Sequence, residues 1–218
     1  MFSRRKFLLA SAAVLGSSWT GLAAASRSPL ELRVDYTATS LIDDGDEHAV
    51  PGRLWRTPIA LRHESVQAGR PLTVIARLDR NIVWLAMADP PIAIESDLSA
   101  LDVPLDVLRG GGDMRLVRQG RERVNGLDTV RIRVERKAAS GTSFSGHVWA
   151  TDQGVIARLA GEGASHGRRG RTLMNFRDVQ VGRLDPILFE APRGVQLVGV
   201  KGADLQTLLQ GFAAGPRR

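Results

Sequence analysis

Histidine is the side chain most often able to act as an acid, a base or a metal ligand near neutral pH, and the four histidines of this sequence stand far apart. They occupy positions 48, 63, 147 and 166, with no H-x-x-x-H or H-E-x-x-H spacing between them. A zinc enzyme needs three converging nitrogen or oxygen ligands. The chain also has no cysteine, which excludes disulfides, zinc–thiolate sites and thiol catalysis. We therefore expect no metal and no cofactor.

Two glycine-rich segments superficially resemble catalytic or phosphate-binding motifs. Residues 141–146 (GTSFSG) lack the G-x-S-x-G spacing of a nucleophile elbow and join two predicted strands, whereas the elbow needs a strand followed by a helix. Residues 110–112 (GGG) lack the Lys-Ser/Thr of a phosphate loop. The sequence thus predicts a protein that is not an enzyme. A lipid hydrolase with dispersed catalytic residues is the alternative.

Two charged clusters have simple structural interpretations. Residues 43–47 (DDGDE) do not follow the spacing of a calcium-binding EF-hand loop and predict a solvated hairpin turn. Residues 166–171 (HGRRGR) form the densest basic run and favour a charged hairpin tip. The alternative for the basic run is contact with anionic lipid headgroups or with an acidic partner.

The overall charge and composition describe an ordinary globular chain of 218 residues. Its formal charge of +7 comes from 30 Lys and Arg against 23 Asp and Glu, and three of the basic residues are Arg4, Arg5 and Lys6. Without these three, 27 basic residues oppose 23 acidic ones. The composition of 43% hydrophobic and 24% charged residues argues against disorder throughout.

Residues 1–25 are predicted to be an export signal. A basic start precedes a moderately apolar stretch, and residues 23–25 (AAA) supply the small side chains that a signal peptidase recognises. Residues 3–8 (SRRKFL) resemble the twin-arginine signature S/T-R-R-x-F-L, although Leu9 replaces the usual Lys. The alternatives are a general secretory signal and a retained membrane anchor. We expect cleavage before Ser26 and a soluble periplasmic protein, which disfavours a nucleic-acid partner.

From Pro29 onward, apolar residues recur mostly at every second position, which predicts β-strands. The clearest alternation is in residues 30–38 and 130–135, while residues 82–87 (IVWLAM) are apolar on both faces. The same pattern predicts further strands at residues 49–56, 58–66, 72–78, 91–95, 114–119, 122–125, 143–150, 155–162 and 171–181.

Helical spacing of leucines is confined to residues 96–109, interrupted by Pro104, and to residues 203–212. The predicted fold is therefore mainly β: a single curved antiparallel sheet of about ten strands forming a half-open barrel, with a few short helices on its concave side. We divide the chain into the signal at 1–25, one domain at 26–200, and a C-terminal helix and tail at 201–218.

An incompletely closed sheet can leave an apolar interior wide enough for a ligand. The two expected helical segments are too short to cover about ten strands, and a lipid acyl chain would fill the remaining space with roughly 0.8 kcal/mol per buried methylene. A tightly packed core is the alternative. The candidate ligand-binding residues are Trp55, Leu72, Val74, Trp84, Met87, Phe144, Trp149 and Met174.

Several segments between residues 30 and 195 together resemble the LolA-like superfamily of periplasmic lipoprotein-sorting proteins, and above all its less characterised relatives. The resemblance rests on the order of short motifs. They are 52–55 (GRLW), 61–64 (LRHE), 75–85 (IARLDRNIVWL), 122–126 (ERVNG), 146–156 (GHVWATDQGVI) and 188–194 (LFEAPRG). Arg62 with Glu64, and Arg77 with Asp79, each share one face of a strand and are expected to form surface ion pairs worth under ~1 kcal/mol.

The resemblance implies a half-open barrel that holds a lipid-linked ligand in its concave face. Three departures argue against lipoprotein shuttling itself: no helix precedes the first strand, Ala93 replaces the aromatic residue of a Y-x-E step, and there is no lipidated cysteine. The predicted function is a periplasmic carrier or sorting protein for a lipid acyl chain or lipoprotein, acting as a monomer. The alternative is a regulatory or sensor module that contacts an envelope membrane protein.

Overall fold

The computed structural model describes residues 30–43, 47–67, 69–98, 114–137, 143–165 and 168–201. Most of these residues lie in β-strands, and described helical structure is limited to short 3-10 turns such as η2 (Pro186–Phe189). The strands in chain order are β1 Leu32–Ile42, β2 His48–Arg56, β3 Ala60–Gln67, β4 Arg70–Arg77, β5 Ile82–Met87, β6 Ile92–Asp97, β7 Met114–Val124, β8 Leu127–Lys137, β9 Ser143–Ala150, β10 Ile156–Ser165, β11 Arg168–Val181 and β12 Gln196–Gly199.

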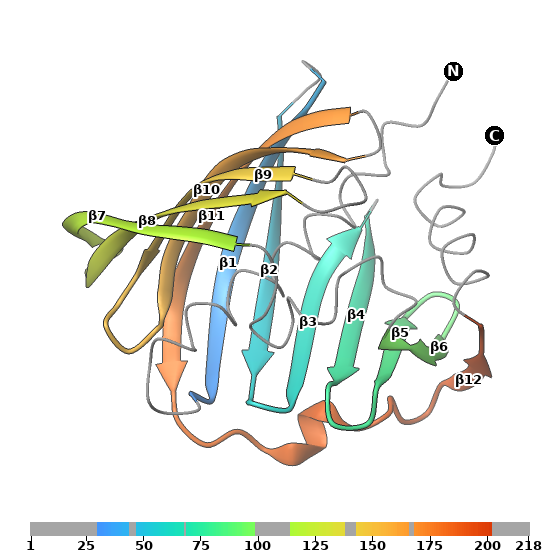
Figure 1. Cartoon of the computed structure of the whole chain (residues 1–218). Coiled ribbons are helices and arrows are strands. Elements are labelled where there is room, and N and C mark those ends of the chain that lie inside the picture. The colour runs from blue at the N-terminus through green and yellow to red at the C-terminus, as the bar shows by residue number, and fades with distance from the viewer. Residues whose placement is uncertain are drawn as a thin grey trace.

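All the described strands belong to one 12-stranded sheet with the order β12-β6-β5-β4-β3-β2-β1-β11-β10-β9-β8-β7. Every neighbouring pair is antiparallel except β12 and β6, which run parallel. Figure 1 shows one strongly curved layer, in which β7–β9 arch away from β2–β6. The mainly β, single-sheet prediction is confirmed. The sheet remains open and does not close into a barrel, since β12 and β7 are its two edges.

The two faces of the sheet differ in character because side chains alternate along each strand. On one face, here called the apolar face, Val34 lies opposite Leu54 on the neighbouring strand, and Phe176 continues the row on β11. On the other, here called the charged face, Arg33 and Asp35 form an ion pair. The period of two in the sequence thus marks which side of the sheet is buried.

Buried side chains of the apolar face form two clusters. The larger spans β1, β2 and β8–β11, and the smaller spans β4–β6 together with Leu98. Among the described residues, no second sheet lies over this face.

On the charged face, residues 182–192, here called the strap, connect β11 to the last strand of the sheet. Phe189 of η2 packs against Trp55, Ile75 and Trp84. The strap is also held by polar contacts, since Arg62 donates a hydrogen bond of 3.1 Å to the Leu188 carbonyl. The part of the charged face beneath η2 is therefore apolar and covered.

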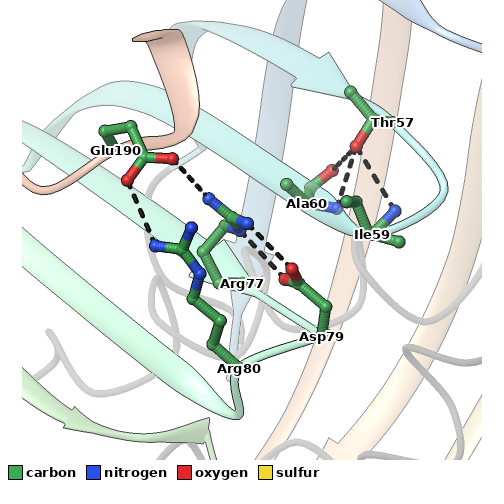
Figure 2. A network of polar contacts seen from close by, with 7 residues as sticks. All are labelled: Thr57, Ile59, Ala60, Arg77, Asp79, Arg80 and Glu190. Atoms are coloured by element: carbon green, nitrogen blue, oxygen red, sulfur yellow. Dashed lines mark hydrogen bonds and ion pairs between the residues drawn. The ribbon is translucent and has the colours of Figure 1, made fainter. Parts of the chain in front are cut away.

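A network of ion pairs fixes the end of the strap (Figure 2). The guanidinium of Arg77 contacts Asp79 at 2.8 Å and Glu190 at 2.7 Å, and Arg80 contacts the second oxygen of Glu190 at 3.2 Å. The Arg77 side chain is only 9% exposed. The expectation of surface pairs holds for Arg62 and Glu64, whereas Arg77 is buried and joins two segments that are far apart in the sequence.

Some predicted elements differ from the structure or lie outside its described part. Residues 114–124 are one strand, β7, because its register continues through a bulge between Arg118 and Gly120. Strand β12 was not expected, since four residues are too few to display an alternation. The export signal, most of the 96–109 insert and the 203–212 helix lie outside the described residues.

Candidate functional site

The structure places five of the eight candidate ligand-binding residues on the apolar face. Leu72 and Met87 are direct cross-strand partners on β4 and β5, with Val74 two residues further along β4. Phe144 and Met174 belong to the larger apolar cluster on β9–β11. The five thus lie on one side of the sheet but in two groups, separated by β1–β3.

The three tryptophans lie on the opposite, charged face. Trp55 and Trp84 pack beneath Phe189 of the strap, and the indole N–H of Trp84 donates a hydrogen bond of 2.7 Å to Glu95. Trp149 donates to Glu122 and has the Arg158 guanidinium 5.7 Å from its ring centroid. These tryptophans therefore do not line the apolar face.

Phe144 lies flat against a glycine-lined part of the apolar face. A methyl group added at Gly161 would come within 2.5 Å of the Phe144 ring, and one at Gly146 within 2.9 Å of it. These glycines face each other across β9 and β10. Only residues without a side chain allow the ring to approach the backbone so closely. Phe144 is left half-buried.

A polar pair that we did not predict as a site lies between the two groups of candidates. The hydroxyl of Tyr36 is hydrogen-bonded to Nε2 of His63, and the two rings are stacked with centroids 5.7 Å apart. Phe176 flanks Tyr36 at 5.9 Å on the neighbouring strand. Tyr36 and His63 are 4% and 5% exposed, so the pair is buried, with the buried Ser65 two residues from His63 on the same face.

Gly52 makes room for this pair. It lies directly opposite Tyr36 on β2, and a methyl group added to it would come within 2.2 Å of the tyrosine ring. The tyrosine ring therefore lies across the β2 backbone toward β3, which carries His63. The sequence offered only an unspecific signal for this site. Gly52 and His63 occupy positions at which the alternation favours apolar residues.

Burial sets the charge state of the pair. Desolvation raises the pKa of the Tyr36 hydroxyl and lowers the pKa of His63 to about 4, because each charged form loses its hydration. At neutral pH both groups are therefore uncharged. The direction of their hydrogen bond depends on the imidazole tautomer: the hydroxyl donates when the ring proton is on Nδ1, and Nε2 donates when the proton is on Nε2. This pair can orient a polar group but is poorly suited to proton transfer near pH 7.

The described residues show little other chemistry. No group of three His, Cys, Asp or Glu side chains that could hold a metal ion occurs among them. On the charged face, the Arg53 guanidinium holds the pKa of Asp35 below its usual range through a hydrogen bond. The arrangement fits a binding surface better than a reaction centre.

The part of the chain that the structure describes contains no helix long and apolar enough to cross a membrane.

No protein-family model and no curated protein matches this sequence. Among solved structures, an uncharacterized conserved protein from Thermus thermophilus matches with a TM-score of 0.52 and 10% identity, over 88% of this chain and 99% of the other. The two chains share one fold.

Two further solved structures match at TM-scores below 0.5. The LolA superfamily protein NE2245 from Nitrosomonas europaea has a TM-score of 0.42 and 10% identity, over 82% of this chain and 97% of the other. The MucA/MucB complex of Pseudomonas aeruginosa has a TM-score of 0.44 and 17% identity, over 85% of this chain and 64% of the other.

Proposed function

We propose that this protein is a periplasmic carrier or sorting protein that holds an acyl chain of a lipid or lipoprotein against the apolar face of its sheet. Catalysis is not part of the proposal. The order of motifs shared with the LolA-like superfamily and the N-terminal segment with its twin arginines support the compartment and the class of ligand.

One observation carries the proposal. Apolar side chains form one face of a single open sheet from β8 to β6, and the described residues place no second sheet over it. Most of these side chains are buried, so the proposal concerns the half-buried apolar positions at their margins. The half-buried Leu72, Val74 and Phe144 are the described candidates that remain accessible to a ligand.

The Tyr36–His63 pair adds a polar feature to this surface. Fatty acids and lipid anchors carry a carbonyl or carboxyl group next to an extended hydrocarbon. With its proton on Nδ1, a neutral His63 would offer that N–H as a donor to such an oxygen. We propose that the hydrocarbon of the ligand lies along the apolar face and that the Tyr36–His63 pair forms a hydrogen bond with the carbonyl or carboxyl group of the ligand.

Native mass spectrometry of the protein released gently from the periplasm tests this function. A mass excess that disappears on extraction with organic solvent and is identified as an acylated molecule supports it. A clean apo mass, together with no uptake of a fluorescent fatty acid, contradicts it. Co-purification with an envelope membrane protein instead of lipid would favour the regulatory alternative.

A further inference from the structure

The hairpin of β7 and β8 concentrates positive charge at one edge of the sheet. Residues 115–136 contain seven arginines and three carboxylates. Once Arg4, Arg5 and Lys6 are set aside, the remaining chain has 27 basic and 23 acidic residues. Residues 115–136 alone therefore carry four excess positive charges, as many as the net charge of the chain without Arg4, Arg5 and Lys6.

Four of these arginines have no acidic partner among the described residues. Arg121 contacts Asp152 at 2.9 Å, Arg131 contacts Glu122 at 4.0 Å and Arg133 contacts Glu135 at 2.7 Å. The other four make no ion pair with a described carboxylate. They are Arg115, Arg118, Arg123 and Arg136. Elsewhere on the sheet, arginines such as Arg53 and Arg62 are paired, whereas Arg70 makes no ion pair with a described carboxylate.

Apolar side chains are exposed among these unpaired charges. Leu116 and Val117 are 40% and 41% exposed, and residues 115–123 of β7 are all exposed. Because successive side chains of a strand point to opposite faces, both faces of this edge present arginine next to an aliphatic group. Arginine beside exposed aliphatic groups is the combination found where proteins contact the interface of an anionic membrane.

The edge is poorly suited to pairing with another strand. Charged side chains and bulges are the devices by which proteins protect sheet edges from strand addition, and β7 has four arginines and a bulge between Arg118 and Gly120. An acidic peptide added as a further strand is thus the weaker fit. We infer that the β7–β8 edge is a docking surface for an anionic lipid bilayer.

Co-sedimentation with vesicles tests this assignment. We expect the full chain to bind vesicles of phosphatidylcholine mixed with phosphatidylglycerol and to bind vesicles of phosphatidylcholine alone much more weakly. The variant R115Q/R118Q/R123Q/R136Q should lose about a hundredfold or more in partition, since each arginine near an anionic surface contributes roughly a factor of five. The loss should shrink as added salt shortens the Debye length from about 10 Å at 0.1 M to about 3 Å at 1 M.

A matched control removes the same charge elsewhere. Arg70, Arg183, Arg193 and Lys201 are exposed and make no ion pair with a described carboxylate. The variant R70Q/R183Q/R193Q/K201Q should therefore keep most of the vesicle binding, and both variants share the same N-terminal segment. Circular dichroism and thermal unfolding verify that each variant is folded.

Three outcomes would overturn the assignment. In the first, the two variants lose binding equally, which would indicate an effect of net charge alone. In the second, the hairpin variant binds like the unmodified chain. In the third, a synthetic peptide of alternating Glu and Val binds the unmodified chain but not the hairpin variant, and anionic vesicles do not compete with it. That result would identify an acidic protein segment as the occupant of the edge.

Discussion

The Tyr36 hydroxyl and the Nε2 atom of His63 are hydrogen-bonded to each other at the centre of the apolar face, although the two residues come from strands that are not neighbours. The strand between them contributes only Gly52 beneath the tyrosine ring. Protonation of His63 would place a charge among buried, mainly apolar side chains. The pair therefore links the stability of the sheet to pH.

We expect stability to fall on acidification because of His63. Its pKa in the folded protein is about 4, below the ordinary value of 6.5, so the unfolded chain binds the proton more readily. The loss begins as pH falls below the unfolded value and grows until the folded value is reached, to about 3 kcal/mol in total. Urea unfolding between about pH 7.5 and pH 4.5 measures it.

The substitution H63F should flatten this part of the pH profile, because the titrating group is gone. The control H147Q alters a half-buried histidine on the charged face and should keep the profile of the unmodified chain. Identical profiles for H63F and the unmodified chain would show that other groups cause the acid sensitivity.

Gly52→Ala should destabilise the protein by about 1–3 kcal/mol, the usual range for overpacking a core. The added methyl group would come within 2.2 Å of the Tyr36 ring, which has little freedom to move because His63 and Phe176 flank it. Gly199→Ala is a matched control, since nothing lies within 4 Å of its added methyl group. Equal unfolding midpoints for the two variants would contradict the close packing.

These two sites show what the sequence could predict and what it could not. Alternation alone correctly predicted strands such as β1 and β8, because each has one apolar and one polar face. Tyr36 meets His63 only through the register that places Gly52 opposite Tyr36 and Leu54 opposite His63. A single sequence does not reveal how strands are aligned, so this pair was not foreseen.

The tryptophans illustrate the same limit. Trp84 stands between Val83 and Leu85 in a strand that is apolar on both faces, so alternation gives no sign of its direction. What decides it is contact with Phe189 of the strap, which is 105 residues further along the chain. Five of the eight candidate residues, on β4, β5, β9 and β11, share the apolar face, and alternation did not separate the covered tryptophans from them.

Removing the charge at Arg77 should loosen the strap. Arg77→Met leaves Asp79 and Glu190 without their shared partner, and hydrogen bonds to charged groups contribute roughly 1.5–3 kcal/mol when buried. We expect faster hydrogen exchange and proteolysis within residues 182–192. Arg80→Met is the control, because its side chain is 48% exposed and its single contact with Glu190 is solvent-accessible. Unchanged exchange in the Arg77 variant would mean that Phe189 packing alone holds the strap.

Replacing Arg4 and Arg5 with lysine should block export if the twin-arginine route is used. The twin-arginine signature contains two consecutive arginines, and lysine keeps the charge while removing that feature. We expect unprocessed precursor in the cytoplasmic fraction on immunoblotting and loss of the periplasmic form. Normal processing of this variant would assign the segment to the general secretory route, which reads the apolar stretch and the basic start.

Val74→Asn should weaken acyl-chain binding on the apolar face. Val74 is half-buried there, opposite Leu85 on β5 and His63 on β3. An amide at this position would place polar atoms against the hydrocarbon of the ligand, which costs about 1–3 kcal/mol, a loss of roughly tenfold or more in affinity. Thr73→Asn introduces the same side chain one residue away but on the charged face, so this variant should bind a fluorescent fatty acid as the unmodified chain does.

Circular dichroism and urea unfolding of both variants separate a loss of binding from a loss of folding. If both folded variants bind equally well, the acyl chain does not lie on the apolar face near Val74, and the proposed site would be wrong even where the protein carries lipid.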